Sequence, residues 1–488
     1  GASFENEREA RSGASPVVSA KSWSSSACGG SPSSGSTPAM RASVLFKYAM
    51  SGPTRLASRA ARNGRPGVQI VVHTDGAETR FTLRGEGFDT EWFQMVAVPV
   101  EYNTGDGETQ DGDMVILPDI CPDYAIRKAP FKVYDCLKPA SNDSASAAIT
   151  AVAGRSALYA CLRPLDGLAP GLHQLELDIQ TAEGSHTIVL NVTVADVLIP
   201  DEQFTVTNWF SLNAIARQHH ETIGSARFMS LLDQYIDAMR RVRQTTFFIE
   251  LDDRCVAKRE PSYSFDFEYL TPIIERFFAG GMTTLEIGQI LSRGFKPDGM
   301  PDMLTDTFTC AMAPDVPLES TQGYDITTAY LRALADYLAR HGWQHNVVVH
   351  IHDEPDAHYP DEATLEARRR QYYMAVAMLK KYLPQARVLE AVKTDFFRGA
   401  LDIWVPTTSG YEAEQQSFDH MRESGDEVWS YVCCEPEGRW LNRFLDQKVI
   451  HSRLLFWGFE RNRIAGFFAL GLQPVPGGHE SVRGDQLP

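Results

Sequence analysis

The sequence predicts two folded parts, an antiparallel β-sandwich over residues 55–200 followed by a (β/α)8 TIM-type barrel over residues 201–472. In the first part, short runs alternate apolar and polar residues between turn signals, which is typical of antiparallel strands with one buried face. In the second part, short apolar runs alternate with long amphipathic segments, which is typical of parallel strands joined by helices. With 488 residues, 43% of them hydrophobic, the chain is long enough to bury two cores.

The two ends of the chain have polar compositions. Residues 11–40 contain eleven serines together with glycines and prolines. Such a composition buries no core, so we expect a disordered Ser-rich leader over residues 1–54. Residues 473–488 are polar and contain several Gly and Pro residues, and we expect them to form a C-terminal tail.

The net charge and the cysteines limit the partners and the location. A formal charge of −17 repels phosphates, so we expect no nucleic acid and no membrane partner, while small neutral substrates stay possible. No apolar run is long enough to span a membrane, and no signal-peptide core is present. Eight cysteines lack metal-ligand spacing, and the adjacent Cys433 and Cys434 are a poor disulfide pair, so we expect reduced thiols and a cytoplasmic location. No cofactor is expected, and the oligomeric state is not predicted.

The predicted strands of the sandwich are short and are separated by Gly, Asp and Pro. They read GVQIVVHT, WFQMVAVPVEY, LHQLELDIQT and HTIVLNVTVADV, at residues 67–74, 92–102, 172–181 and 186–197. The turn signals TGDG and AEGSH fall between strands. Pro200 marks the expected boundary with the barrel.

Eight predicted strands make up the barrel, with helical or loop segments between them. They lie at residues 204–210, 246–251, 284–290, 347–354, 387–392, 401–408, 427–434 and 464–471. The clearest helix is predicted at residues 228–245, where apolar residues recur with helical spacing. Further helices are predicted at residues 267–281, 327–342 and 365–384.

Titratable residues crowd the end of the predicted fourth strand, in VVVHIHDEPDAHYP at residues 347–360. Catalytic groups of such barrels lie where the strands end. Because side chains alternate along a strand, His350, His352 and Glu354 share one face, and we expect that face to line the barrel mouth. Pro355 ends the strand and lets Asp353 turn into the mouth beside Glu354.

Asp353 and Glu354 are the predicted catalytic pair. Two neighbouring carboxyls in a partly buried mouth do not both ionise easily, so one pKa rises and an acid and an anion coexist at one pH. Glycoside hydrolysis needs both states. Adjacent residues are poorly placed to flank a glycosidic bond from opposite sides, so they suit a substrate-assisted route, in which a 2-acetamido oxygen attacks the anomeric carbon. In an ordinary two-carboxylate mechanism, Glu250 would be the second acid. The bland alternative is that Asp353 and Glu354 only cap the following loop and helix.

A sugar site also needs flat apolar faces, and aromatic residues lie at several strand ends and in nearby loops. Taken singly, each is more often a core residue than a sugar subsite, but their recurrence at different strands favours substrate binding. His350 and His352 are expected to hydrogen-bond the carboxylates and fix their geometry. The predicted substrate-binding residues are Trp209, His350, His352, Trp404, Tyr411, Trp429 and Tyr431.

A metal site is the competing interpretation of the same strand end. His350, His352 and Asp353 are residue types that suit zinc, so a metal-dependent hydrolase stays an alternative. In barrel metal hydrolases, however, the His-x-His pair belongs to the first strand, and no other strand end here offers a lysine–histidine set. We therefore prefer the carboxylate interpretation, without a metal.

The segment HIHDEP at residues 350–355, with the sandwich and TNWFSLNAIARQHH before it, resembles glycoside hydrolase family 123 and its relatives of uncharacterised activity. Residues 62–72, 117–124 and 429–467 are similar to the same family, so the resemblance covers most of residues 55–470. The chain departs from the family at residues 469–471, where Ala-Leu-Gly stands in place of a Trp-Gly-x-Asn-like stretch. A non-catalytic or degenerate carbohydrate-binding protein on the same scaffold is therefore a further alternative.

The resemblance implies a retaining β-N-acetylgalactosaminidase that works by substrate assistance through an oxazolinium ion. By this resemblance, Asp353 orients and stabilises the acetamido group, and Glu354 is the acid/base. Tyr431 matches an aromatic position near the site. The expected partner is a glycan or glycoside substrate.

Overall fold

The computed structural model describes residues 18–23, 54–108, 114–117, 122–200, 204–259, 262–297 and 299–469. The expected polar tail and most of the expected leader lie outside these residues. The chain forms two compact units. The first consists of Gly1–Glu101 and Pro130–Asp201, and the second of Tyr102–Ala129 and Glu202–Pro488. In the part of the chain that is described, no helix is long and apolar enough to cross a membrane.

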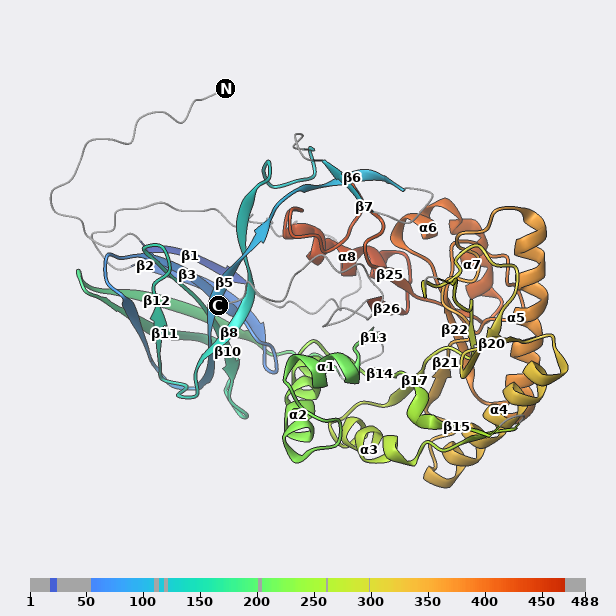
Figure 1. Ribbon diagram of the computed structural model, residues 1–488. Coiled ribbons are helices and arrows are strands. Elements are labelled where there is room, and N and C mark those ends of the chain that lie inside the picture. Colours follow the sequence, from blue (N-terminus) through green and yellow to red (C-terminus); the bar gives the residue numbers. More distant parts are fainter. Residues whose placement is uncertain are drawn as a thin grey trace. The chain divides into compact units, whose positions relative to one another are not determined.

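The first unit contains two five-stranded sheets, with the orders β1-β3-β10-β5-β8 and β2-β12-β11-β4-β9 (Figure 1). The strands are β1 (Val18–Trp23), β2 (Thr54–Ala61), β3 (Gly67–His73), β4 (Glu78–Arg84), β5 (Phe88–Val100), β8 (Phe131–Ser141), β9 (Ser146–Thr150), β10 (Arg155–Pro164), β11 (Gly171–Thr181) and β12 (Gly184–Ala195). Every pair is antiparallel except β2 with β12. Alternate residues such as Val68, Ile70 and Val72 on β3 are buried in one apolar core, as the period-two pattern predicts. The unit is therefore sandwich-like.

Strand β1 lies within the segment for which the sequence predicts disorder. It pairs antiparallel with β3 over its six residues, from Val18 opposite Val72 to Trp23 opposite Gly67. Pairing at a sheet edge needs only backbone N–H and C=O groups in an extended run, so a Ser-rich composition does not prevent it. The prediction of disorder is wrong for these residues, and residues 1–17 and 24–53 lie outside the described part of the leader.

The second unit is built on a nine-stranded, all-parallel sheet with the order β24-β23-β22-β21-β17-β14-β13-β26-β25. The strands are β13 (Thr205–Asn208), β14 (Thr246–Ile249), β17 (Thr284–Ile287), β21 (Val347–Val349), β22 (Arg387–Ala391), β23 (Ile403–Val405), β24 (Glu427–Val428), β25 (Ser430–Val432) and β26 (Gly466–Ala469). Strands β24 and β25 are two pieces of one stretch, interrupted at Trp429, and they stand at opposite ends of the order. The sheet therefore nearly closes on itself as a barrel.

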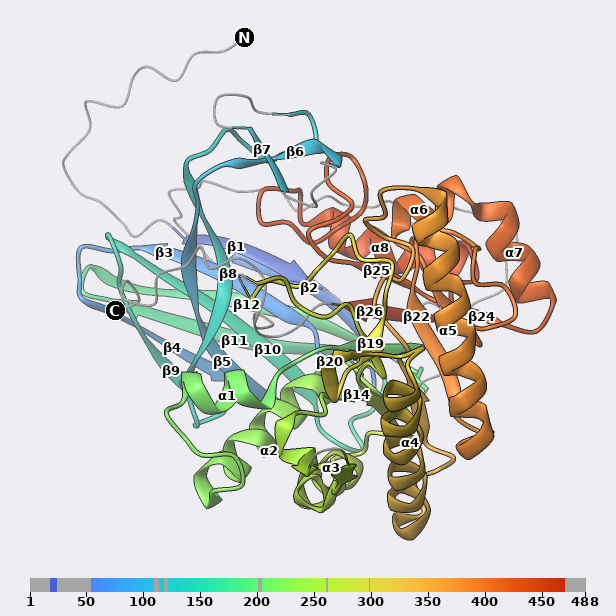
Figure 2. The ribbon, with the colours of Figure 1, turned by 45° about the vertical axis from the view of Figure 1, so that its right-hand side comes forward.

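Amphipathic helices connect the strands. They are α1 (Leu212–Gln218), α2 (Ala226–Arg241), α3 (Thr271–Ala279), α4 (Thr321–His341), α5 (Glu362–Tyr382), α6 (Thr408–Ala413), α7 (Gln415–Glu423) and α8 (Ile450–Arg461). Ser225 and Asp361 cap α2 and α5 by accepting hydrogen bonds from backbone N–H groups of the first turn. On α2, Phe228, Leu232 and Ile236 recur with helical spacing and are buried. Figures 1 and 2 both show α4 and α5 side by side outside the sheet.

The predicted (β/α)8 alternation is met only in part. Residues 392–402, which join β22 to β23, contain no helix. The residues after β26 lie outside the described chain. The connection after β14 holds η1 (Asp253–Cys255), β15 (Val256–Arg259), β16 (Ser262–Phe265) and η2 (Glu268–Leu270), and the connection after β17 holds β18 (Leu291–Ser292), β19 (Thr309–Cys310) and β20 (Ala313–Pro317). The observed fold is a parallel, barrel-like sheet with irregular connections.

A segment of the second unit lies, in the chain, between β5 and β8 of the first. We call residues 102–129 the inserted arm; it contains β6 (Asn103–Glu108) and β7 (Met114–Leu117). Asp446, which is buried in the loop after β25, accepts hydrogen bonds from the Thr104 backbone N–H (2.8 Å), the Thr104 hydroxyl (2.9 Å) and the Asn103 amide (3.3 Å). The arm is therefore fixed to the barrel unit by a buried carboxylate.

Candidate active site

Strand β21 carries the predicted catalytic pair at its C-terminal end. Its side chains alternate as predicted, because Val347 and Val349 belong to the outer core beneath the helices and Val348 to the barrel interior. His350 continues the inward face and is fully buried. Asp353 and Glu354 follow in the turn beyond the strand, and both are only partly buried. Glu354 has a φ of 45°, a left-handed conformation that is costly for a residue other than glycine.

Glu390, at the end of the neighbouring strand β22, holds the main chain just before the pair. One of its carboxylate oxygens accepts hydrogen bonds from the backbone N–H groups of Ile351 and His352, each at 2.9 Å, and from the Tyr372 hydroxyl at 3.1 Å. The other oxygen lies 2.9 Å from Nδ1 of His350. Glu390 is fully buried, and burial raises its pKa. This carboxylate therefore fixes the two residues that precede Asp353.

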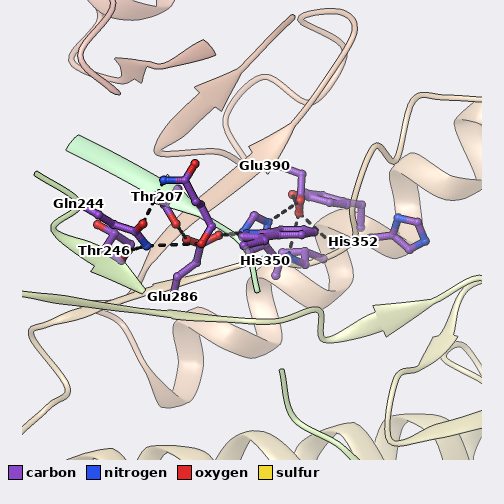
Figure 3. A network of polar contacts seen from close by, with 11 residues as sticks. Thr207, Gln244, Thr246, Glu286, His350, His352 and Glu390 are labelled. Atoms are coloured by element: carbon purple, nitrogen blue, oxygen red, sulfur yellow. Dashed lines mark hydrogen bonds and ion pairs between the residues drawn. The ribbon is translucent and has the colours of Figure 1, made fainter. Parts of the chain in front are cut away.

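His350 lies between two buried carboxylates, as Figure 3 shows. Its Nε2 is 2.8 Å from Glu286 of β17, which also accepts hydrogen bonds from the Thr207 hydroxyl (2.6 Å) and the Trp209 indole N–H (2.5 Å). Burial disfavours a charge on His350, but the two carboxylates outweigh it and raise the pKa of His350 to about 10. His350 is therefore an imidazolium at neutral pH, and both its N–H groups donate.

The environment of Asp353 keeps a proton on this carboxyl group near neutral pH. Burial, followed by the charges of Glu354 and Glu390, raises the pKa of Asp353 to about 7. The positive charges of His350 and Arg293 oppose this shift. Asp353 therefore keeps its proton up to a pH of about 7, next to the second carboxyl group of the pair.

Glu354 is held from two other directions. The hydroxyl of Tyr431, which is buried on β25, donates a hydrogen bond to the Glu354 carboxylate. The Arg293 guanidinium donates to the Glu354 carbonyl oxygen at 2.7 Å. Burial lowers the pKa of Arg293, against the nearby charges of Glu354, Asp353 and Asp356. The side chain of Glu354 is thus fixed by strand β25, and its backbone by the connection that follows β17.

Two further buried residues shape the loop that carries the pair. Asp356 accepts hydrogen bonds from the backbone N–H groups of Lys393 and Thr394, which follow β22. Arg368 of α5 donates to four carbonyl oxygens, and its side chain is fully buried. The carbonyls belong to Met303, Thr305, Ala357 and His358. These contacts tie the loop after β21 to the neighbouring loops.

His352 has a different environment from His350. Its ring stacks on Phe308 with 4.3 Å between ring centres, and it is buried. Within the described residues, its Nδ1 has no hydrogen-bond partner. Burial, and secondarily the charge of Arg293, lowers the pKa of His352 well below its usual range, so His352 is neutral. It does not hydrogen-bond either catalytic carboxylate through its ring in the described structure.

The predicted aromatic residues do not form one surface. Tyr431 contacts Glu354. Trp209 packs in the barrel interior, with 5.3 Å between the centres of its ring and the ring of His350. Trp404 points outward, where it packs on Phe418 of α7. The remaining two are also buried: Tyr411 of α6 donates to Asp419, and Trp429 fills the end of the barrel where β14 and β17 begin. The positions of Trp404, Tyr411 and Trp429 therefore do not support their predicted role in substrate binding.

The metal interpretation does not fit the geometry of His350. Both of its ring nitrogens are engaged by buried carboxylates, Nδ1 by Glu390 at 2.9 Å and Nε2 by Glu286 at 2.8 Å, so neither is open to a metal ion. Among the residues that the structure describes, no group of three or more His, Cys, Asp and Glu side chains is arranged to hold a metal. The proposed set of His350, His352 and Asp353 is not assembled here.

Sequence reasoning missed Glu286, Glu390, Arg293 and Arg368. Glu286 and Glu390 each stand as a lone acid within an apolar strand, in TLEIGQI and RVLEAV. A charge at such a position is costly unless it is paired, so a lone acid in a barrel strand signals a buried polar network. Arg368 and Arg293 lie in a charged helix and a long loop, and no sequence signal distinguishes them.

Comparison with known proteins gives one family match and a solved structure with a similar fold. A family model for the catalytic domain of glycoside hydrolase 123 matches residues 209–472. A family 123 glycoside hydrolase from Clostridium perfringens, studied for glycolipid glycan hydrolysis, has a similar fold, with a TM-score of 0.59 at 12% identity over 86% of this chain and 74% of that chain. A family 39 glycoside hydrolase from the gut symbiont Bacteroides cellulosilyticus has a TM-score of 0.35 at 12% identity, over 83% of this chain and 75% of that chain. No curated protein matches the sequence.

Proposed function

Because the chain belongs to glycoside hydrolase family 123, we propose that this glycoside hydrolase removes terminal β-linked N-acetylgalactosamine with retention of configuration. The observation that carries the proposal is the adjacent pair Asp353 and Glu354, in which the pKa of Asp353 is raised to about 7 and Glu354 is held by Tyr431. Two adjacent carboxyl groups, one of which holds its proton up to a pH of about 7, can supply the acid and the anion that hydrolysis needs.

In the proposed mechanism, the acetamido oxygen of the substrate attacks the anomeric carbon and the bond to the leaving oxygen breaks. Glu354 gives its proton to the leaving oxygen, and an oxazolinium ion forms. Glu354 then takes a proton from water, which attacks the anomeric carbon and restores the acetamido group. Two inversions at the same carbon give retention.

Asp353 has the role of binding the acetamido N–H as an anion. The substrate N–H stabilises the charged form of Asp353, so the proton of Asp353 moves to Glu354, where the leaving oxygen needs it. The positive charges of His350 and Arg293 favour the same state. Substrate binding would thus prepare the acid as well as the anion.

The test is hydrolysis of two aryl β-glycosides, the N-acetylgalactosaminide and the plain galactoside, each with and without a chelator. We expect cleavage of the acetamido sugar alone, unaffected by chelation. Equal cleavage of both sugars would exclude substrate assistance, and loss of activity on chelation would favour a metal. The N-acetylglucosaminide, measured in parallel, reports the preference for the configuration at C4.

We also propose that the enzyme acts in the cytoplasm on a glycan or glycoside. Its support is that the cysteines within the described ranges, at positions 136, 161, 255, 310, 433 and 434, are all free. Free thiols persist in a reducing compartment. Fractionation of cells that express the natural gene, followed by detection of the protein, tests this location.

A further inference from the structure

Two adjacent cysteines lie at the end of the strand that holds the acid. Cys433 and Cys434 directly follow β25, which carries Tyr431, and their Sγ atoms are 3.8 Å apart. Successive side chains of an extended chain point to opposite faces, so adjacent cysteines normally keep their sulfurs apart. The contact between these two sulfurs therefore needs a turn.

The turn is fixed by hydrogen bonds on both sides. The Cys433 backbone N–H donates to the carbonyl of Glu435 (2.8 Å), and the Glu435 N–H donates to Sγ of Cys433 (3.3 Å). The buried amide of Asn442 donates to the carbonyls of Cys433 (3.2 Å) and Pro436 (3.0 Å). The arrangement of the two thiols is thus built into the loop.

The two thiols differ in accessibility and in acidity. Cys434 is exposed, and Cys433 is half-buried. When Cys434 ionises, the thiol of Cys433 keeps its proton and donates a hydrogen bond to the new thiolate, which lowers the pKa of Cys434. The same contact, together with burial, raises the pKa of Cys433. The negative charges of Glu435 and Glu354 oppose this ionisation of Cys434. An exposed thiol that ionises more readily is the better nucleophile at neutral pH.

We propose that Cys433 and Cys434 form a dithiol modification site that reacts with small disulfides. The Cys434 thiolate attacks one sulfur of the small disulfide, forms a mixed disulfide and releases the first small thiolate. Cys433 then attacks the Cys434 sulfur and displaces the second small thiolate, which closes a disulfide between the two cysteines. The protons of the two cysteines end on the two released thiols, so the protein loses two electrons and the small disulfide gains them.

The closed disulfide is expected to be labile. Neighbouring Cα atoms are about 3.8 Å apart, less than the roughly 4.4–6.8 Å of ordinary disulfides, and the sulfurs have to approach to about 2.05 Å. This strain gives the bond a high reduction potential, so a modest excess of a small thiol reopens it. The site is suited to reversible modification and not to a structural cross-link.

The test is a mass measurement on the full-length protein after treatment with oxidised glutathione. Trypsin releases Glu423–Arg439, which contains both cysteines. We expect this peptide to lose about two mass units, keep no glutathione, and regain its mass with mild reductant. Cys136, which is exposed and has no adjacent cysteine in the sequence, serves as the internal reference and should keep a mixed disulfide.

Single substitutions separate the two steps. With Cys433→Ser, Cys434 should keep a stable glutathione adduct, because the resolving thiol is absent. With Cys434→Ser, the peptide should stay unmodified in the time that modifies Cys136. A wild-type peptide that keeps glutathione, or stays unmodified while Cys136 reacts, would overturn the proposal. The measurement needs no turnover, so its result is independent of the proposed glycosidase activity.

Discussion

Glu390 accepts hydrogen bonds from the two backbone N–H groups before Asp353, so a change at this residue reaches the catalytic pair through the main chain. Glu390→Gln keeps the size of the side chain and removes its charge. We expect kcat to fall about 10- to 100-fold, because charge-assisted hydrogen bonds are lost, with little change in KM.

The matched control for this change is Tyr372→Phe, which removes one hydrogen bond to Glu390 and leaves its contacts with the backbone and His350 in place. Steady-state kinetics should show a much smaller effect for this variant. If Glu390→Gln left kcat unchanged, or if the two variants lost kcat equally, Glu390 would not act by positioning Asp353.

The raised pKa of Asp353 predicts the pH dependence of turnover. The wild-type enzyme needs the proton that Asp353 holds, which is lost as the pH rises through about 7, so kcat/KM should fall above that pH. In Glu354→Gln the neighbouring negative charge is gone, so the pKa of Asp353 falls. With an activated aryl glycoside, which needs little help from an acid, this variant should be active above the lowered pKa and lose activity as the pH falls through it.

This reversal, from loss at high pH to loss at low pH, is measured as kcat/KM from pH 4 to 9 for both proteins. Glu354→Gln should also lose roughly 100- to 10,000-fold of its turnover on substrates with poor leaving groups.

Asp353→Asn should impair every 2-acetamido substrate, whatever its leaving group. Unchanged turnover by Asp353→Asn contradicts substrate assistance.

At the scale of elements, helix α5 positions the catalytic loop through one side chain. Arg368 is fully buried and donates to four carbonyl oxygens in two loops, so Arg368→Met removes four hydrogen bonds at once. We expect a loss of roughly 2–4 kcal/mol in the free energy of unfolding and a lower kcat.

A second change in the same helix serves as the control. Asp361→Ala removes the N-cap of α5 and should cost about 1 kcal/mol, with kcat unchanged. Denaturant unfolding and steady-state kinetics on both variants separate the two effects. Equal losses of kcat would mean that α5 acts only through its stability.

The positions of the strands follow from the sequence, and the orientation of particular side chains does not. The eight predicted strands of the barrel match observed ones because each is a short apolar run bounded by turn residues. Trp404 was expected in the site, but it lies between Ile403 and Val405, which both face inward, so it faces the helices. The parity of Trp429 was hidden by the break between β24 and β25.

The candidate site, too, could be predicted from the sequence only in part. The sequence predicts that Asp353 and Glu354 lie near the barrel mouth, because the end of an apolar strand can be recognised from the sequence. The pairing of His350 with Glu286 and Glu390 depends on three strands that are far apart in the chain, and single-sequence patterns do not report such contacts. The strand at residues 18–23 was not predicted, because backbone pairing at a sheet edge leaves little trace in the composition.

At the scale of the whole molecule, the inserted arm is the least predictable feature and has a measurable energetic role. Replacing both Asn103 and Thr104 by Ala removes the two side-chain hydrogen bonds to buried Asp446. We expect a loss of roughly 2–4 kcal/mol in the free energy of unfolding, because a buried charge loses part of its compensation.

The effect should shrink when Asp446→Asn is added, because a neutral amide is less costly to leave without partners. A double-mutant cycle by chemical denaturation of the full chain measures this coupling. Additive effects of the two changes would show that the arm does not stabilise Asp446.

During synthesis, the arm is made long before the part of the barrel unit that it contacts. Thr104 and Asp446 are 342 positions apart in the chain. A ribosome that adds about 5–20 residues per second needs roughly 20–70 seconds to go from one to the other. For that interval the arm has left the ribosome and its carboxylate partner does not yet exist, so water has to satisfy its polar groups. Each nascent chain thus passes through a period in which strands β5 and β8 can pair while the segment between them waits for the last part of the barrel.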